Sequence, residues 1–384
     1  MFRKRRWQLA ACCLLTALVT IAAVVGTEAV LLNRLTGSAS ESVRFLRTMN
    51  LLKRNYNGEV GNHQLFDGAI KGMVEAAGDP YTVYLNSKDF QQLSEMTGGS
   101  FGGIGIVFGK RGNDYVVISA LEDNPGAKAG IKSGDIITAI DGNPTRDMNM
   151  EQVANKIRGK HGTVVKLELK GKDGKLRTVS VERCEIKNPS VGGQLLPDTK
   201  IGYIRIAVFN ENTGDDFAKK YAELEKQGMQ ALVLDLRGNP GGVFDAGVAV
   251  AGMLVPKGPI VSVVDKNGNK YEETSSLEKV KYPLAVLVDH GSASAAEIVA
   301  GAIKDTKSGK LFGTKTFGKG SVQSVYRLDS NTAVKITVAK YYTPSGVSIH
   351  NVGIEPDVKV ELPEDATVDV QLKAAEDYLL QQLQ

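Results

Sequence analysis

The sequence is poor in the side chains that form disulfides or bind metal ions. Of its three cysteines, Cys12 and Cys13 lie within an apolar run near the N-terminus, which leaves Cys184 as the one thiol in the rest of the chain. An intrachain disulfide is therefore excluded there. The four histidines are scattered and have none of the spacings of a zinc site. We expect no disulfide, no bound metal and no cofactor.

A strong charge of either sign is also lacking. The net charge is +4, from 47 basic and 43 acidic residues. The cluster Arg3, Lys4, Arg5 and Arg6 alone supplies an excess of that size. Because the rest of the chain is neutral overall, the composition argues against a nucleic-acid-binding protein.

An uncharged apolar segment, Trp7–Thr27, follows the basic cluster. As a helix it would span roughly 30 Å, the thickness of a bilayer core. Since cytoplasmic flanks of membrane segments are enriched in Lys and Arg, we expect a single-pass anchor in the cell membrane, with all that follows on the extracytoplasmic side. A cleaved signal peptide is the alternative, although no clear A-x-A site follows the apolar run.

The chain is long enough for two or three domains. Helical periodicity after the apolar segment is broken by Gly78-Asp79-Pro80, then alternating strands follow, and then strands alternate with helices. The pattern predicts a multidomain α/β protein with a β-rich domain ahead of an α/β core. The expected parts are a basic start with the membrane anchor (1–35), a helical region (36–98), the β-rich domain (99–187), the α/β core (188–364) and a C-terminal helix (365–384).

The β-rich part begins with a glycine-rich loop, Gly103-Ile104-Gly105-Ile106. Together with the run from Asn124 to Ile137, it resembles a PDZ domain of the kind found in exported proteases. In that family the N–H groups of the loop bind the terminal carboxylate of a peptide, and the next strand pairs with the peptide. For the loop alone, a structural hairpin is the alternative. Alternating residues predict strands at 115–118, 136–140 and 164–169.

In the α/β part, two apolar strands each lead into a turn and then an apolar helix. Ala231–Asp235 leads into a turn that ends at Gly242, where free N–H groups would suit an anion or an oxyanion. Leu284–Val288 leads to Ser294, whose small neighbours would let a substrate carbonyl approach. Ser294 with Glu297 also forms a capping-box pattern, so a purely structural role for this serine stays open.

The segment Gly313–Gln323 comes close to a phosphate-binding loop, because Lys319 follows its second glycine at the P-loop spacing. A P-loop needs Ser or Thr after the lysine and a helix behind it, whereas Gly320 and a strand pattern follow here. Export would also remove the chain from cytosolic ATP, which disfavours nucleotide binding. Ser276–Lys279 matches the S-x-x-K of β-lactamases without the companion motifs of that family.

Taken together, these segments resemble the carboxyl-terminal processing peptidases, the tail-specific serine proteases. The resemblance implies an α/β serine-protease core with an inserted PDZ domain. It also implies an endopeptidase that acts on proteins or peptides with free C-termini, here joined to the membrane anchor expected above. The C-terminal helix could pack on the body of the protein or on a second subunit, which leaves a homodimer open. The resemblance extends from about residue 40 to 360 and rests on six ordered motifs: Gly78–Tyr81, Gly98–Ile106, Asp235–Gly242, Ser292–Glu297, Gly313–Gln323 and Tyr341–Gly346.

The resemblance also implies a role for each matching residue. Ser294 corresponds to the nucleophile, Lys319 to the general base and Gln323 to the residue that orients the lysine. The oxyanion donors correspond to the N–H of Ala295 and to that of Gly241 or Gly242. The PDZ peptide site corresponds to the loop residues Gly103, Ile104, Gly105 and Ile106.

A serine–lysine pair works only when the lysine is neutral as it accepts the serine proton, whereas free lysine has a pKa of about 10.4. The segment from Gly313 to Leu328 contains no acidic residue, and Phe317 and Val322 flank Lys319. This setting favours a desolvated amine with a lowered pKa.

Two positions depart from the family pattern. Asp289-His290 stands where an asparagine and a small residue are common, and Val347 stands where arginine is common. His290 keeps a histidine-assisted mechanism open. A non-catalytic PDZ scaffold on a degenerate protease fold is the other alternative, but such a protein would have no need to keep Ser294, Lys319 and Gln323 together.

Overall fold

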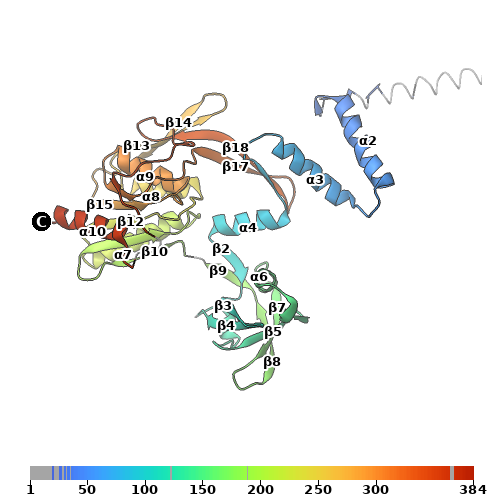
Figure 1. Ribbon diagram of the computed structural model, residues 1–384, viewed down its shortest axis with the longest axis horizontal. Helices are drawn as coiled ribbons and strands as arrows, with labels where there is room; N and C mark the ends of the chain where they lie inside the picture. The colour runs from blue at the N-terminus through green and yellow to red at the C-terminus, as the bar shows by residue number, and fades with distance from the viewer. Residues whose placement is uncertain are drawn as a thin grey trace, which may run out of the picture. The chain divides into compact units, whose positions relative to one another are not determined.

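The computed structural model describes residues 20, 26–27, 30–31, 33–34, 36–121, 123–187, 189–363 and 367–384 (Figure 1). Its contacts divide the chain into two compact units, Met1–Gly78 and Asp79–Gln384. Most of the expected anchor, Trp7–Thr27, lies outside the described residues. Within the ranges given above, no helix combines the length and the apolar character needed to cross a bilayer.

The first unit contains the helices α2 (Ala39–Asn55) and α3 (Asn62–Glu75), which confirm the helical periodicity expected for this region. Ser38 precedes α2, and its hydroxyl accepts a hydrogen bond from the N–H of Glu41 at 3.3 Å. This is the capping that a serine at a helix start supplies. Neither helix contains a buried residue.

The second unit begins with a short strand and a helix, β1 (Val83–Leu85) and α4 (Ser87–Gly98). The side chain of Asn86 caps α4 by accepting from the N–H of Lys88 and of Asp89. Gly99 ends the helix with a φ of 67°, in the left-handed region that favours glycine. The helix therefore stops where the β-rich domain begins.

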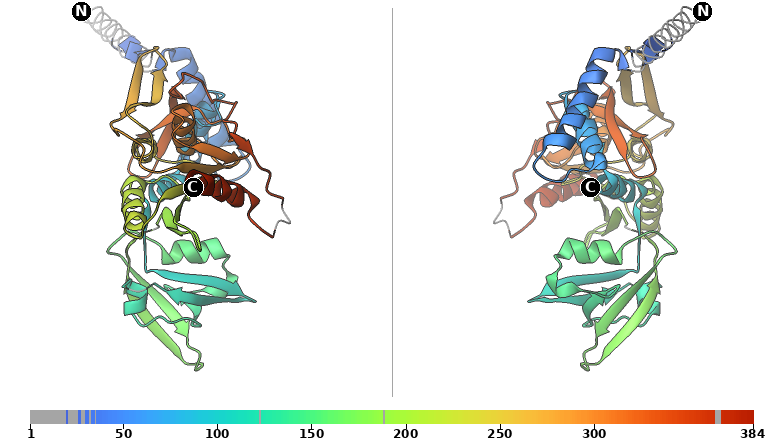
Figure 2. Two further views of the ribbon diagram at one scale, coloured as in Figure 1. Left: turned by 90° about the vertical axis from the view of Figure 1, so that its left-hand side faces the viewer. Right: turned by 90° about the vertical axis from the view of Figure 1, so that its right-hand side faces the viewer.

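The β-rich domain is built on an antiparallel sheet with one face covered. Buried and exposed residues alternate along β7, so that Val165, Leu167 and Leu169 are fully buried. Figure 2 shows helix α6 beside the strands of this domain. The sheet has the order β3 (Ile106–Arg111), β4 (Asp114–Ala120), β5 (Ile136–Ile140), β7 (Val164–Lys170) and β8 (Leu176–Glu182), with β6 (Asn143–Pro144) against β5; the other elements are α5 (Pro125–Lys128), the 3₁₀ turn Thr145–Asp147, α6 (Met150–Ile157), and the pair β2 (Ser100–Gly103) and β9 (Cys184–Lys187).

The α/β core is a six-stranded sheet in which β10 is antiparallel to β11 and the other neighbours are parallel. β12 and β15 are buried at every position, as central parallel strands are. Their bounds are those predicted from the apolar runs. The order is β10 (Val191–Leu195), β11 (Ile201–Ile206), β12 (Ala231–Asp235), β15 (Leu284–Val288), β16 (Lys310–Gly313) and β19 (Val358–Lys359).

Helices cover both faces of this sheet. One apolar cluster joins Leu234 and Val286 to residues of α7 (Thr213–Lys226), α8 (Phe244–Gly252) and α9 (Ala295–Asp305). A second cluster joins Val233 and Leu287 to residues of α10 (Val370–Gln382). Because adjacent strand residues point to opposite faces, each strand contributes to both clusters.

A second sheet completes the unit. β18 (Ala333–Tyr342) lies at its centre, with β1 and β13 (Gly258–Asp265) on one side, β17 (Ser321–Arg327) on the other, and β14 (Lys270–Ser275) beyond β13. Within the described part of the chain, β17 pairs with β18 alone and is therefore an edge strand. The strand predicted after Lys319 is confirmed.

Arg237 joins the C-terminal helix to the end of β12. Its guanidinium donates to the buried carboxylate of Asp235 at 2.7 Å and to Asp369, the cap of α10, at 2.8 Å. Burial would lower the pKa of Arg237, but the two carboxylates outweigh it and raise that pKa. The pairing neutralises a carboxylate that is entirely inaccessible to water.

Candidate active site

The turns that follow β12 and β15 lie side by side, because these neighbouring strands are parallel. Asn239, which is fully buried, fixes the first turn. Its side chain donates to the carbonyl of Ile206 and accepts from the N–H of Gly241, both at 2.8 Å. Its own carbonyl accepts from the N–H of Ala293 at 2.9 Å. The glycine turn is therefore bonded directly to the segment that carries Ser294.

Glycine is required in the first turn by close approach as well as by conformation. Gly241 has a φ of 89°, and a Cβ there would lie 2.6 Å from the Cβ of Ser294 and 2.8 Å from the nitrogen of Ala295. Gly242 has a φ of 140°, and a Cβ there would lie 1.9 Å from the carbonyl oxygen of Phe209. A side chain at Gly241 would therefore push the two turns apart, and one at Gly242 would collide with the backbone that follows β11.

Ser294 has an unusual backbone conformation for a residue other than glycine. It precedes α9 with φ 54° and ψ −117°. Such a conformation costs on the order of 1–3 kcal/mol and persists only where the surroundings impose it. Strained serines between a strand and a helix are typical of turns that expose a nucleophile.

Glu297 connects the helix start to the segment that contains Lys319. This fully buried carboxylate accepts from the N–H of Ser294 at 2.9 Å, and from the N–H of Gly318 and of Lys319 at 2.8 Å each. The hydroxyl of Thr316 donates to it at 2.6 Å. Four donors compensate the burial of one charge. The capping interaction expected from the sequence is present, but the contacts with residues 316–319 are additional.

Tyr341 holds the same two segments from the other side. Its hydroxyl, on β18, lies 3.1 Å from the carbonyl oxygen of Ser294 and within hydrogen-bond distance of the carbonyl oxygen of Lys319. Burial, with a smaller contribution from Glu297, raises the pKa of Tyr341 well above its usual value. The hydroxyl therefore stays protonated as a donor.

The environment of the Lys319 amine lowers its pKa. Burial is the main cause, and the positive charge of Lys335 adds to it, while Glu297 and Asp79 act in the opposite direction. The Nζ atom lies 5.0 Å from the centre of the Tyr81 ring. The direction agrees with the desolvated amine that the sequence predicted.

Gln323 lies in the same region but does not contact the lysine amine in this structure. Its side-chain nitrogen donates to the carbonyl and the hydroxyl of Ser321, at 3.1 and 2.8 Å, and approaches the hydroxyl of Thr337 at 3.5 Å. No hydrogen bond joins Gln323 to Lys319 among the residues described. The orienting role implied by the family resemblance therefore stays a prediction.

One cavity of about 570 Å³ brings the predicted residues together. Its wall includes Ser294, Lys319, Gln323, Gly241 and Gly242. It also includes apolar residues of α4, of the start of α8 and of β17, namely Phe90, Leu93, Met96, Val243, Phe244, Val322 and Val325. The arrangement offers a hydroxyl, an amine with a lowered pKa and a partly apolar groove that a peptide could occupy.

Two backbone N–H groups beside Ser294 lack a partner in the described part of the chain, that of Gly242, which lines the cavity, and that of Ala295, a buried residue outside the lining. The N–H of Gly241 is donated to Asn239. This difference favours Gly242 over Gly241 as the partner of Ala295 in an oxyanion hole.

The other candidates from the sequence lie away from this cavity. His290 is exposed, its ring stacks 5.5 Å from that of Phe317, and it does not line the wall. Ser276 and Lys279 are exposed residues that follow β14. Neither a histidine-assisted nor a β-lactamase-type arrangement is formed.

A second predicted site, the PDZ loop, borders a smaller cavity of about 280 Å³. Gly103, Ile104, Gly105 and Ile106 form one side, and Ile157 of α6 belongs to the other. The carbonyls of Ile104 and Gly105 accept hydrogen bonds within the fold, whereas their N–H groups have no acceptor among the residues described. Free N–H groups at the end of a groove suit a carboxylate.

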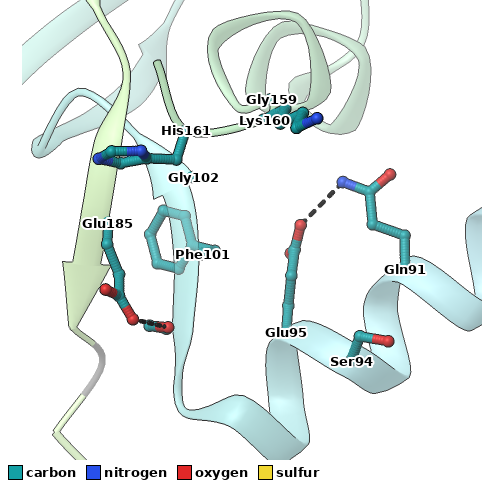
Figure 3. Close-up of a pocket in the computed structure, with 10 residues that line it drawn as sticks. Gln91, Ser94, Glu95, Phe101, Gly102, Gly159, Lys160, His161 and Glu185 are labelled. Carbon is teal, nitrogen blue, oxygen red and sulfur yellow. Dashed lines mark hydrogen bonds between the residues drawn. The ribbon is translucent and has the colours of Figure 1, made fainter. Parts of the chain in front are cut away.

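A third cavity, of about 600 Å³, lies between α4 and the strands β2 and β9. Figure 3 shows Glu95 of α4, which accepts a hydrogen bond from the side chain of Gln91, and Glu185 of β9 across the cavity. Its wall contains none of the candidate catalytic residues. We do not assign it to catalysis.

Comparisons with known proteins find three family models that match parts of this chain. A family model described as peptidase family S41 matches residues 200–360, one described as a PDZ domain matches 116–171, and one described as the activating protease CtpB N-terminal domain matches 29–89.

Two relatives come from Bacillus subtilis (strain 168). Its carboxy-terminal processing protease CtpA is 38% identical over 317 residues, which is 82% of this chain and 68% of that protein. CtpB from the same organism is 35% identical over 324 residues, covering 83% and 67%. The solved structure of a photosystem II D1 C-terminal processing protease covers 88% of this chain and 97% of its own, with 32% identity and a TM-score of 0.48.

Proposed function

The chain belongs to peptidase family S41, the carboxy-terminal processing serine proteases, and we propose that it is an endopeptidase with Ser294 as nucleophile and Lys319 as general base. One observation carries the proposal. Both side chains line a single cavity, and the Glu297 carboxylate accepts from the backbone N–H of both residues. Among the described residues no hydrogen bond joins the Ser294 hydroxyl to the Lys319 amine, but one cavity holds the hydroxyl and the amine of lowered pKa that nucleophilic catalysis with a lysine base requires.

The first half-reaction forms an acyl-enzyme. Neutral Lys319 takes the hydroxyl proton of Ser294 as the oxygen attacks the scissile carbonyl carbon. The negative charge moves to the carbonyl oxygen, which accepts from the N–H groups of Ala295 and Gly242. When this intermediate collapses, the C–N bond breaks, and the Lys319 ammonium gives its proton to the leaving amine.

The second half-reaction uses water. Lys319, neutral again, takes a proton from a water molecule whose oxygen attacks the ester carbon. The C–O bond to Ser294 then breaks, and the serine oxygen recovers the proton from Lys319. We propose that Gln323 rotates toward Lys319 when substrate is bound, since hydrogen bonds in empty active sites often tighten only in the complex.

The PDZ domain is proposed to bind the tails of substrates. The free N–H groups of Ile104 and Gly105, beside an apolar cavity, support recognition of a free and apolar C-terminus. Binding there would keep the substrate chain near the protease core and raise its local concentration.

We further propose that Trp7–Thr27 anchors the protein in the cell membrane, with the protease on the extracytoplasmic side. The support is the uncharged apolar run and the basic cluster that precedes it. Protease added to intact cells should cut exposed loops of the folded domains. If those loops are protected until the cells are lysed, the proposed orientation is wrong.

The test of the main proposal is cleavage of casein by the full-length protein in detergent. We expect the native protein to release peptides, and Ser294→Ala to release none while it unfolds at a similar temperature. Retention of cleavage by Ser294→Ala would falsify the assignment of the nucleophile.

A further inference from the structure

The cavity that contains Ser294 is lined by three cationic side chains and by no carboxylate. The cations are Lys319, Arg327 and Lys335. Among the ion pairs formed by the described residues, none involves any of these three side chains. Lys319 is neutral when it acts as the base, which leaves Arg327 and Lys335 as charges without a counter-ion.

The register of β17 and β18 places these two charges together. Val325 lies opposite Lys335, and Arg327 is two residues beyond Val325, so all three point to the same face of the sheet. Arg327 and Lys335 are thus diagonal neighbours, which are typically about 7–8 Å apart. The Arg327 guanidinium also packs 5.4 Å from the centre of the Phe90 ring, on the cavity wall.

Two like charges on one sheet face repel each other, and the repulsion weakens when an anion binds between them. Peptides carry one common kind of anionic group, the carboxylate, either on a side chain or at the chain terminus. Arginine is well suited to it, because its planar fork of donors matches carboxylate geometry. The apolar residues on the same wall would accept the rest of the peptide.

We propose that Arg327 and Lys335 form an anion subsite of the catalytic cavity, which binds a substrate carboxylate close to the scissile bond. The inference rests on the proposed function and adds a substrate class to it, peptides with an acidic residue or a short free tail beside the cleavage position. β17 supports such binding because its outer edge is unpaired among the described residues and could align a peptide backbone.

The test compares cleavage of matched peptides. In one amidated peptide, Glu replaces Gln in turn at each position that flanks the cleaved bond. A further arm uses the Gln peptide with a free terminal carboxylate. We expect kcat/KM of the native protein to favour a carboxylate by roughly three- to fivefold, the effect of about 1 kcal/mol from a partly exposed ion pair. The preference should decrease as salt is added.

Arg327→Gln is the decisive variant, because Arg327 does not contribute to the lowered pKa of Lys319. The preference should fall close to one in Arg327→Gln, and Arg327→Lys should restore part of it. Lys340→Gln is the matched control, since Lys340 is an exposed residue of the same strand as Lys335 but does not line the cavity. This control should keep the preference.

A second measurement does not depend on turnover. Labelled Glu and Gln peptides are titrated against Ser294→Ala and against Ser294→Ala combined with Arg327→Gln, with fluorescence anisotropy as the readout. The Arg327 change should weaken binding of the Glu peptide more than that of the Gln peptide. A preference for the free terminus that Arg327→Gln abolishes would identify the terminal carboxylate as the ligand of this subsite, because binding of that terminus by the PDZ domain does not depend on Arg327.

The subsite is overturned if the native protein treats Glu and Gln peptides and both termini alike, or if Arg327→Gln keeps the full preference. The same peptides distinguish a failure of the proposed function. If Ser294→Ala cleaves them as fast as the native protein, the assignment of the nucleophile fails, and the anisotropy titration still decides whether the subsite exists.

Discussion

Glu297 accepts a hydrogen bond from the backbone N–H of Lys319 at 2.8 Å, although the two residues lie 22 positions apart. The same carboxylate oxygen accepts from the N–H of Ser294. One buried charge therefore sets the distance between the segments that carry the proposed nucleophile and base. The single hydroxyl proton of Tyr341 lies between the carbonyl oxygens of the same two residues, so a shift of either segment would disturb a buried hydrogen bond.

The first prediction concerns this carboxylate. In Glu297→Gln, an NH₂ group must replace one of the two oxygens, and both oxygens face N–H or O–H donors. We expect the free energy of unfolding to fall by about 1–3 kcal/mol, the cost of leaving buried donors unsatisfied. We also expect a lower kcat, because the two segments lose their common partner.

Denaturant unfolding and peptide kinetics measure the two effects. Glu278→Gln, at an exposed position outside the cavity, is the control and should change neither quantity. If Glu297→Gln unfolds at the native denaturant concentration, the carboxylate does not hold these segments together.

The second prediction concerns the charge state of Lys319. Because the amine must be neutral to accept a proton, the rate should rise with pH through a pKa below that of ordinary lysine, which burial and Lys335 lower. Lys319→Ala and Lys319→Arg should both abolish cleavage, since guanidinium stays protonated. Near-normal turnover in Lys319→Arg would rule out this base.

Although Lys319 is needed for activity, its burial is expected to make the folded protein less stable. A pKa lowered by folding means that the unfolded chain binds the proton more tightly, so the protonated amine costs stability at pH values below the pKa of the folded state. Lys319→Met should therefore unfold at a temperature no lower than that of the native protein at neutral pH.

In Lys335→Gln, the rise of the cleavage rate with pH should move to higher pH, because a charge that lowers the pKa of Lys319 is lost.

A third prediction uses the strain at Ser294. Glycine adopts a φ of 54° with a ψ of −117° far more readily than alanine does. Ser294→Gly should therefore be more stable than Ser294→Ala by about 1 kcal/mol or more, although both should be inactive. Calorimetry of the two variants provides the comparison, and equal transition temperatures would show that the backbone at this position is relaxed.

The fourth prediction concerns the PDZ domain. Peptides with a free, apolar carboxyl terminus should bind to Ser294→Ala, and amidation of the terminus should weaken binding, because the N–H groups at Ile104 and Gly105 lose their anionic partner. A fluorescence-anisotropy titration measures this. Equal affinity for the free and the amidated peptide would exclude carboxylate recognition by this loop.

The two central strands of the α/β core, β12 and β15, were predictable from the sequence to the residue, whereas several contacts of the site were not. Ala231–Leu234 and Leu284–Val288 are uninterrupted apolar runs, the pattern expected of strands that are buried on both faces. The turns after them, with Ser294 and the glycines, were recognisable because strained turns restrict residue type. The resemblance to a known family pointed to Lys319.

The contacts of Glu297 and Tyr341 depend on long-range packing. Glu297 fits a capping pattern, which predicts its hydrogen bond with Ser294. The pattern does not predict the hydrogen bonds that Glu297 accepts from residues 316–319. Tyr341 reaches the site only because β18 passes behind it, and local periodicity does not encode that placement. Gln323, to which the resemblance assigned an orienting role, lines the cavity, but its hydrogen bonds to Ser321 and Thr337 follow from rotamer choice, which no sequence pattern specifies.

The link from Arg237 to Asp369 makes the end of the chain a structural support of the reaction centre. Arg237 immediately precedes the turn whose Gly242 N–H we propose as an oxyanion donor, and Asp369, the N-cap residue of α10, pairs with the Arg237 guanidinium. A truncation before Asp369 would leave Asp235 and Arg237 without that partner and expose the apolar face that α10 covers. Affinity tags and reporter fusions should therefore leave α10 whole, because losing this helix would loosen the turn that lines the cavity of Ser294.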